Sequence, residues 1–418
     1  MNNKITKIEA EEIKDSRGNP TIKVIVWVGE KSGSFSVPSG ASTGAHEAHE
    51  LRDPEPEQAR YGAGFDGKGG IKKAIWNVEN IIAPLLVGQD VLNQKEIDKI
   101  MLELDGTTNK DNLGGNAIVG VSIACAKVAA KISSLETFEY LRTLAEVKPS
   151  RKMPYLFMNL LEGGKHTKNV LAFQEYHIVP KVENISEAVE IGIKIQNSLK
   201  EIISKELGEE SLMLGDEGGF APRVSDIRKP LEFLAKTIKE NNLEQKVRLA
   251  LDVAASSFFS DGKYKIDGKE IPKEELLEIY NSLIEEFNLF SIEDPFEEED
   301  FESFKKLKEN CRNLFVVGDD LTVTNVLLLQ KAIEKRSINA IIIKPNQIGT
   351  LTETLETMKL AREYEIELII SHRSGETDDD FIADLAYAFG CFGLKAGSPQ
   401  KAERMLKYKR LIQIQDKF

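Results

Sequence analysis

Three apolar runs decide the fold of this chain: Phe290-Ser-Ile-Glu293, Leu314-Phe-Val-Val-Gly-Asp319 and Ala340-Ile-Ile-Ile-Lys344. Each run is rich in β-branched or aromatic residues, is too short for a helix, and stops at a charged residue, which is typical of a buried strand in a parallel sheet. The three charged residues follow one another at steps of 26 and 25 positions, and the segments between them have helical periodicity. One strand and one helix per step is a βα repeat, in which charged groups at successive strand ends converge on one face.

The repeat extends over the C-terminal part of the chain. After Pro154 come roughly 265 residues, close to the size typical of a (β/α)8 barrel. Two helical patterns, at Ser186–Leu207 and Lys229–Asn241, occur back to back before the third strand. We therefore expect an α/β fold with an irregular barrel that opens strand, strand, helix, helix. The eight candidate strands are Tyr155–Leu161, Phe173–Pro180, Arg248–Asp252, Leu289–Glu293, Leu314–Asp319, Ala340–Lys344, Glu367–Ser371 and Gly393–Ala396.

The N-terminal part has a different pattern. Its first 37 residues alternate in polarity and contain turn signals, which predicts an antiparallel meander of about three strands. From Ile71 to Leu144 the apolar spacing becomes helical, so this part is expected to be an α+β domain. The Gly-rich segment 37–45 is typical of a turn or of a lid that closes on a ligand, and we expect a mobile loop there. We place a capping domain at residues 1–145 and a catalytic barrel at 146–418.

The composition argues against several kinds of partner. Of the 418 residues, 41% are hydrophobic and 29% are charged, as in an ordinary globular enzyme. The net charge of −13 argues against nucleic acid or an anionic membrane as the main partner, because both reward a basic surface. No segment approaches the roughly 20 apolar residues of a membrane span, and the charged start lacks the apolar core of a signal peptide. Cys125, Cys311 and Cys391 fit neither a disulfide framework nor a CxxC site, so we expect a reducing cytoplasm.

Eight ionisable residues lie at the predicted strand ends or in the segments beside them. A single charge at a strand end is more often a solvated edge or a helix cap, but eight that point into one mouth indicate a site. Among them, the like charges of Asp252, Glu293 and Asp319 need a compensating cation, and an all-oxygen set favours Mg²⁺. The sequence has no motif for zinc, dinucleotide or P-loop nucleotide binding. The eight residues are Glu175, Glu217, Asp252, Glu293, Asp319, Lys344, His372 and Lys395.

Two residues of this set could act as base and acid. Lys344, beside a divalent cation and Lys395, should lose its proton more readily, because nearby positive charge disfavours the ammonium form. The plainer alternative is an ion pair between Lys344 and Asp319 or Asp320. Glu217, in a Gly-rich loop, could be a protonated acid or simply part of a polar turn.

The run Ser371-His-Arg-Ser374 precedes a predicted helix. Arg373, Ser374 and backbone amides at the helix N-terminus would form an anion pocket that fits a phosphate. A capping sequence for that helix is the alternative interpretation, and both can hold at once.

Eight short motifs, spread nearly from end to end of the chain, resemble those of the enolase family. They are Asp15-Ser-Arg-Gly-Asn-Pro-Thr21, Pro38-Ser-Gly-Ala-Ser-Thr-Gly44, Phe173-Gln-Glu-Tyr176, Gly215-Asp-Glu-Gly-Gly219, Ser291-Ile-Glu-Asp294, Gly318-Asp-Asp-Leu-Thr-Val-Thr-Asn325, Lys344-Pro-Asn-Gln-Ile-Gly349 and Ser371-His-Arg-Ser-Gly-Glu-Thr377. The resemblance implies a lyase of glycolysis, reversible in gluconeogenesis, that dehydrates 2-phosphoglycerate to phosphoenolpyruvate. A lysine base with two Mg²⁺ ions per active site belongs to what the resemblance implies, and so does a homodimer or a multiple of dimers.

The resemblance also implies a role for each site residue. Lys344 would take the C2 proton of the substrate, and Glu217, assisted by Glu175, would protonate the leaving 3-hydroxyl. The metal ligands would be Asp252, Glu293 and Asp319 for the first Mg²⁺ and Ser42 for the second. The substrate-binding residues would be His166, Gln174 and His372 along the pocket, Arg373 and Ser374 at the phosphate, and Lys395 at the carboxylate.

Three positions depart from the family pattern, and two other functions stay open. Glu162 stands where the family usually has Asn, Ala396 replaces Thr, and Lys401 replaces Arg. A racemase or lyase of the same superfamily, acting on a different carboxylate, would keep the three carboxylates but would not need the lid at Ser42. A macromolecule-binding protein that has lost catalysis is the alternative of another class, and the intact set of acid, base and metal ligands argues against it.

Overall fold

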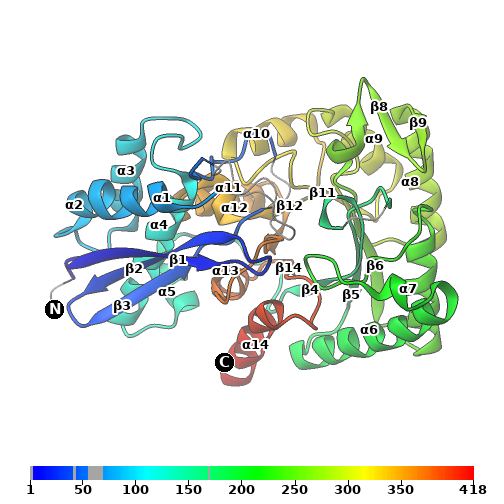
Figure 1. The fold of residues 1–418 in the computed structure, drawn as a ribbon, viewed down its shortest axis with the longest axis horizontal. Coiled ribbons are helices and arrows are strands. Elements are labelled where there is room, and N and C mark those ends of the chain that lie inside the picture. The colour runs from blue at the N-terminus through cyan, green and yellow to red at the C-terminus, as the bar shows by residue number, and fades with distance from the viewer. Residues whose placement is uncertain (1–2, 41–43, 55–68, 168–169) are drawn as a thin grey trace.

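The computed structural model describes residues 3–40, 44–54, 69–167 and 170–418. The chain forms two parts that lie side by side (Figure 1): a small sheet with helices, coloured blue to cyan, and a barrel coloured mainly green, yellow and orange. Residues 41–43, within the loop expected over 37–45, lie outside the described residues, so that expectation stays untested.

The N-terminal sheet consists of β1 (Lys7–Lys14), β2 (Pro20–Val28) and β3 (Lys31–Ser36), which are antiparallel and lie in that order. The predicted meander is therefore confirmed. Helix α4 (Gly115–Ile132) packs so closely on this sheet that a Cβ at Gly120 would lie only 2.6 Å from Val24 Cγ2, and the absence of a side chain at Gly120 permits this approach. The other helical elements are α1 (Lys72–Asn77), a π-helical turn at Val78–Ile82, α2 (Ala83–Leu86), α3 (Gln94–Asp105) and α5 (Thr137–Leu144).

Of the described helices, α4 is the one that is long and apolar enough to cross a membrane by length and composition. Within the protein, 83% of this helix is buried. Its apolar character is accounted for by its place in the core of the N-terminal part, against β2 and β3.

The barrel is closed, with the strand order β10-β11-β12-β13-β14-β4-β5-β6. Helices α6 (Ile185–Leu207) and α7 (Lys229–Glu240) follow β5 and precede β6, which confirms the expected opening of strand, strand, helix, helix. The strands are β4 (Tyr155–Glu162), β5 (Glu175–Pro180), β6 (Val247–Asp252), β10 (Ser291–Glu293), β11 (Phe315–Gly318), β12 (Ala340–Ile343), β13 (Glu367–Ser371) and β14 (Gly393–Lys395). The later helices are α8 (Lys273–Phe287), α9 (Phe301–Asn310), α10 (Val326–Lys335), α11 (Pro345–Ile348), α12 (Leu351–Glu363), α13 (Phe381–Ala388) and α14 (Ala402–Lys417).

Strand β5 runs antiparallel to both of its neighbours, whereas the other strand pairs of the barrel are parallel. Its first residue, Glu175, pairs in register with Asp252, the last residue of β6. The reversal therefore places Glu175 at the same mouth as the charged residues at the carboxyl ends of the parallel strands. A short sheet of β7 (Phe259–Ser260), β8 (Lys263–Ile266) and β9 (Lys269–Ile271), which the sequence analysis did not anticipate, lies beside the barrel.

The opposite end of the barrel is filled by aromatic rings. Phe157, Phe290, Phe315 and Phe392 lie at or near the starts of their strands, and the rings of Phe315 and Phe392 are 4.5 Å apart between centroids. This apolar filling closes one end, as in other small barrels. Polar groups therefore gather at the other end.

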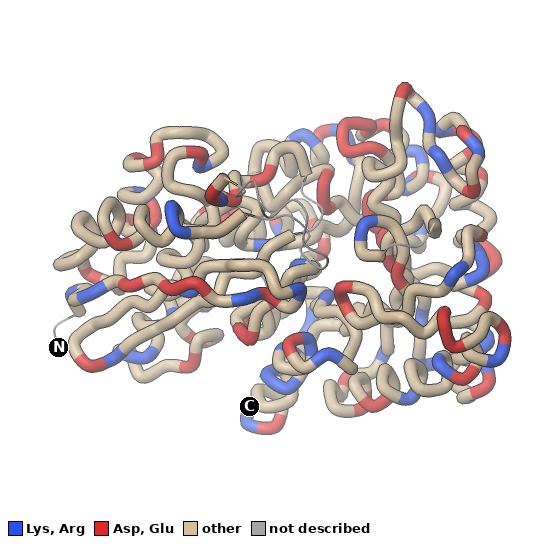
Figure 2. Tube along the Cα trace, viewed as in Figure 1, with Lys and Arg blue, Asp and Glu red and all other residues tan. Residues whose placement is uncertain are grey.

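The two parts pack through helices. Helix α5 contacts α13, and α3 contacts α12, so the N-terminal part lies against the helices that follow β12 and β13. Figure 2 shows acidic and basic residues interspersed over both parts of the described chain.

Candidate active site

The carboxyl-end mouth of the barrel contains a small cavity of about 30 Å³, room for about one water molecule. Lysine side chains that fold onto the carboxylates leave little space here. The cavity is lined by His166, Gln174, Glu175, Glu217, Asp252, Ala254, Asp294, Asp319, Asp320, Lys344, Ser371, His372, Arg373, Ser374 and Lys395. Glu293 is the register partner of Asp252 on the neighbouring strand. Every predicted site residue is therefore at this mouth except Ser42, which lies outside the described residues.

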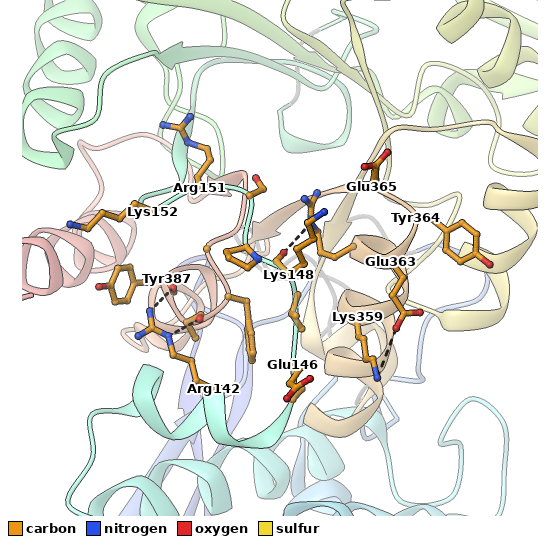
Figure 3. A pocket seen from close by; sticks show the side chains of 18 residues that line it. Arg142, Glu146, Lys148, Arg151, Lys152, Lys359, Glu363, Tyr364, Glu365 and Tyr387 are labelled. Carbon is orange, nitrogen blue, oxygen red and sulfur yellow. Dashed lines mark hydrogen bonds and ion pairs between the residues drawn. The ribbon is translucent and has the colours of Figure 1, made fainter.

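A much larger cavity, of about 1450 Å³, lies near the starts of β4, β13 and β14, at the other end of the barrel (Figure 3). Of the described residues, six basic ones line it, and three of these donate to backbone carbonyls: Arg142 to those of Tyr387 and Ala388, Arg151 to that of Met153, and Arg362 to that of Lys148. None of the predicted site residues that the structure describes lines this cavity, so its size does not make it the candidate site.

Lys395 holds three carboxylates together. Its Nζ lies 2.6 Å from Asp252 Oδ2, 2.9 Å from Glu293 Oε1 and 3.3 Å from Glu175 Oε1, and all four side chains are buried. Burial disfavours the ammonium form, but the carboxylates outweigh it and raise the pKa of Lys395 well above its usual value. Burial alone would raise the pKa of Asp252, but the ammonium group of Lys395 outweighs burial and holds the pKa of Asp252 below its usual range.

Lys344 forms an ion pair with Asp319, the plainer of the two alternatives that the sequence left open. Burial alone would lower the pKa of Lys344, but the Asp319 carboxylate outweighs it and raises that pKa. The lowered pKa that the sequence predicts for Lys344 beside a divalent cation stays a prediction. Asp319 is itself fixed, because Asp294 accepts the backbone N–H groups of Asp319 and Asp320 at 2.9 and 2.7 Å.

Glu217 faces two histidines and an asparagine. Its Oε2 lies 3.1 Å from His372 Nε2 and accepts a hydrogen bond from Asn159 Nδ2 at 3.2 Å, and its Oε1 lies 3.9 Å from His166 Nδ1. Burial would raise the pKa of Glu217, but the histidines and Arg404 outweigh it and hold that pKa well below its usual value. The sequence left the protonation state of Glu217 open, and the lowered pKa favours its ionised form in this structure.

Glu175 is the neighbouring carboxyl group that favours the proton. Burial and the charge of Glu217 raise the pKa of Glu175 well above its usual value. Ligand atoms of Glu175, Glu217 and His166 lie within 4.8 Å of one another. One proton shared by the two carboxyl groups is the natural state of such a buried pair.

The anion pocket differs in one respect from the prediction. Arg373 and Ser374 line the mouth, but α13 begins only at Phe381, so they do not lie at a helix N-terminus. The reason is that Gly375 exchanges two backbone hydrogen bonds with Ser39 of the N-terminal part, at 2.8 and 2.9 Å, which keeps the segment extended.

The arginine of this pocket is held from several directions. The Arg373 guanidinium donates to both carboxylate oxygens of Glu47, at 2.8 and 3.2 Å. Arg404, fully buried on α14, donates to the carbonyls of Arg373 and Ser374 at 2.6 and 2.7 Å. A buried cation beneath the backbone orients the segment toward the mouth.

Sequence reasoning missed several residues that hold this site, among them His177, Glu47 and Arg404. His177 Nε2 lies 2.8 Å from Glu175 Oε2, and burial lowers the pKa of His177 to about 3, so it is neutral. The signal for His177 was available, since a residue two positions after Glu175 in a strand points to the same side. The patterns around Glu47 and Arg404 give no such signal, because long charged side chains usually lie at the surface.

The donor chemistry of the mouth fits a hard divalent cation. Asp252, Glu293 and Asp319 offer oxygen atoms alone, and each of them forms an ion pair with Lys344 or Lys395. Among the described residues, the all-carboxylate group whose ligand oxygens lie within 4.8 Å of one another is Asp294, Asp319 and Asp320, which shares only Asp319 with the predicted set. Such carboxylate clusters are the kind that Mg²⁺ and similar ions occupy.

Comparison with known proteins adds independent information. The family model described as "Enolase, N-terminal domain" matches residues 5–141, and that described as "Enolase, C-terminal TIM barrel domain" matches residues 150–418. A curated enolase of Methanocaldococcus jannaschii is 45% identical over 416 residues, which cover 99% of this chain and 95% of the relative. Enolases of Methanopyrus kandleri and Thermococcus gammatolerans are each 44% identical, over 99% of this chain and 96% and 95% of their own lengths.

Proposed function

This chain belongs to the enolase family and dehydrates 2-phosphoglycerate to phosphoenolpyruvate, and we propose that the charged mouth of its barrel performs this reaction. The observation that carries the proposal is the placement of Lys344 across the barrel from the Glu175 and Glu217 pair. Lys344 follows β12, and four steps around the closed sheet separate β12 from β5, where Glu175 lies. A base and an acid on opposite sides of a bound substrate suit an elimination.

Lys344 is the proposed general base that removes the C2 proton. Removing a proton beside a carboxylate builds negative charge, which preorganised cationic groups stabilise. To accept a proton, Lys344 must first be neutral, whereas Asp319 favours its ammonium form here. Asp319 is also a proposed metal ligand, and a carboxylate that binds a metal is a weaker counter-charge for the lysine.

Glu217 is the proposed general acid, and Glu175 assists it. The two carboxyl groups favour one shared proton. That proton can pass from Glu175 to Glu217, and Glu217 can then donate it to the leaving 3-hydroxyl. His177 supports this arrangement because it fixes the second oxygen of Glu175.

The proposed cofactor is Mg²⁺, with two ions per active site. Asp252, Glu293 and Asp319 would hold the first ion and Ser42 would help to hold the second. When bound, the ions supply positive charge that offsets the charge developing on the substrate carboxylate.

The remaining site residues would bind substrate. Arg373 and Ser374 would hold the phosphate, Lys395 would meet the carboxylate, and His166, Gln174 and His372 would line the pocket. Gln174 Oε1 and His166 Nδ1 support this proposal, because they are buried and have no hydrogen-bond partner among the described residues. A buried polar atom without a partner costs stability unless a ligand or water satisfies it.

Three further features are proposed on the family resemblance. The capping domain spans residues 1–145 and the catalytic barrel 146–418, which is supported by family matches that end at 141 and resume at 150. The protein works in the cytoplasm, in keeping with its three free cysteines. It assembles as a homodimer or a multiple of dimers, and nucleic acid is not its main partner.

An absorbance assay tests the proposed function. The purified protein with Mg²⁺ and 2-phosphoglycerate should form the ultraviolet-absorbing product, chelation should stop this, and added Mg²⁺ should restore it. Lys344→Ala should abolish turnover, whereas Lys359→Ala, an exposed change at the large cavity, should retain it. Activity that survives Lys344→Ala would refute the base assignment, and an inactive unmodified protein would refute the proposal as a whole.

A further inference from the structure

The loop that carries Glu217 has little rigidity of its own. Residues 215–219 form a turn with three glycines, Gly215, Gly218 and Gly219, and no regular helix or strand. Glycine gives the backbone more freedom than any other residue. A carboxylic acid that must meet one substrate oxygen needs such a loop to be held from outside.

Glu162, the last residue of β4, supplies that hold. Its side chain is completely buried, and its carboxylate accepts the backbone N–H of Gly219 at Oε1, at 2.6 Å, and that of Glu217 at Oε2, at 3.2 Å. Both hydrogen bonds go to the backbone of the loop and one goes to Glu217 itself. The rigid barrel strand therefore fixes the position of the acid.

The loop is in direct contact with this carboxylate. A Cβ at Gly215 would lie 2.1 Å from Glu162 Oε2, and one at Gly219 would lie 3.0 Å from Glu162 Oε1. Any side chain at Gly215 would therefore displace the carboxylate. Gly215 therefore permits the close approach of the loop to Glu162, and Gly219 permits close approach both to Glu162 and to the backbone of Leu160.

The chemistry of the contact favours a carboxylate over an amide. Two N–H donors face the side chain of Glu162, one at each oxygen. A carboxylate accepts at both oxygens, whereas an amide accepts at one and presents donor hydrogens at the other. Burial and the nearby charge of Glu217 raise the pKa of Glu162 well above its usual value. The protonated carboxyl group still accepts at its carbonyl oxygen and keeps some acceptor capacity at its hydroxyl oxygen, which an amide NH₂ group lacks.

The carbonyl groups of the same loop are held from the other side. Lys401 Nζ donates to the carbonyl of Asp216 at 2.9 Å, and Gln196 Nε2 donates to that of Gly218 at 2.9 Å. Glu162 and Lys401 are both positions where this chain departs from the family pattern. Together they satisfy N–H and C=O groups of one short segment.

We infer that Glu162 is a positioning residue for Glu217, which it holds in place through the backbone of the 215–219 loop. The inference rests on the proposed role of Glu217 as the general acid. It assigns Glu162 to the second half of the reaction, departure of the 3-hydroxyl, and not to removal of the C2 proton by Lys344.

The test separates the two halves of the reaction. For each variant, exchange of the C2 proton of 2-phosphoglycerate with solvent is measured beside dehydration, both with Mg²⁺ present. Glu162→Gln should lower kcat for dehydration at least tenfold, with KM within about threefold and C2-proton exchange within about twofold of the unmodified protein. Glu217→Gln should show the same split more strongly.

Asp98→Asn is the matched control. Asp98 is a buried carboxylate that accepts the backbone N–H of Thr352 at 3.0 Å, far from the mouth in the packing of α3 against α12. The Asp98→Asn variant should have lower thermal stability, and its rates of C2-proton exchange and dehydration should equal those of the unmodified protein.

Two results would overturn the inference: unchanged dehydration in Glu162→Gln, or losses of exchange and dehydration by the same factor. If Glu162→Gln does not fold, Glu162→Asp, one methylene shorter, is measured in the same way, and an equal loss of both reactions again overturns it. A Glu217→Gln variant that dehydrates normally would instead refute the proposed acid, so the two failures are distinguishable.

Discussion

Replacing Lys395 with methionine should destabilise the metal-free protein and make its stability depend on Mg²⁺. The Lys395 ammonium lies 2.6 to 3.3 Å from carboxylate oxygens of Asp252, Glu293 and Glu175. Methionine has a similar length but no charge, so the variant would leave three buried carboxyl groups without their cation. Removing one partner of a buried ion pair costs about 3–5 kcal/mol.

The loss of stability in Lys395→Met should be visible as a lower thermal midpoint. At about 2 °C per kcal/mol, the low end for large domains, the thermal midpoint should fall by roughly 6–10 °C in the presence of chelator. Mg²⁺ at about 100 times its dissociation constant should return about 2.7 kcal/mol, because it binds the folded site. The folded-state pKa of Lys395 lies above its unfolded value, so its stabilisation is present in full at neutral pH and is lost only as the pH rises through that raised value.

The assay is thermal unfolding at pH 7 to 8, with chelator and with a series of Mg²⁺ concentrations. Lys239→Met, at an exposed position of α7, is the matched control and should behave as the unmodified protein does. A Lys395→Met midpoint that equals that of the unmodified protein in chelator, or that does not rise with Mg²⁺, would contradict the account of this mouth as a cation-balanced carboxylate cluster.

Two further predictions concern single side chains at the mouth. Arg373→Gln should raise KM for 2-phosphoglycerate roughly 10- to 100-fold in initial-rate measurements, because charge-assisted hydrogen bonds to the phosphate are lost and each loss of about 1.4 kcal/mol in binding is a factor of ten. Arg151→Gln, at the large cavity, is the control and should leave KM unchanged. An unchanged KM in Arg373→Gln would refute the phosphate assignment. His177→Phe should lower kcat about tenfold with little change in KM, because Glu175 loses a hydrogen bond to its carboxyl group. His177→Gln should recover part of the lost kcat. A normal kcat in His177→Phe would refute the role of His177.

The sequence predicted which residues meet at one mouth of the barrel, because barrel geometry converts spacing along the chain into position. Glu293, Asp319 and Lys344 recur at steps of one βα unit, and parallel strands in register bring their ends together. Glu175 needed the reversal of β5, which the pattern of two strands followed by two helices anticipated only as an irregularity.

The protonation states could not be read from the sequence. The pKa of Lys344 is raised and that of Glu217 is lowered in this structure, and the sign of each shift depends on which charged groups lie closest. Spacing along the chain does not show that Asp319 lies against Lys344, or that His372 faces Glu217. The buried Arg404 was missed for a related reason, because its partners, the carbonyls of Arg373 and Ser374 and the ring of His372, are distant in sequence and meet it only in the folded chain.

The most direct test of the central claim, that Lys344 removes the C2 proton and Glu217 expels the hydroxyl, is C2-proton exchange measured beside dehydration in variants of these two residues. Lys344→Ala should lose both reactions, and Glu217→Gln should lose dehydration while exchange continues. Proton exchange that persists in Lys344→Ala, or exchange and dehydration lost together in Glu217→Gln, would contradict it.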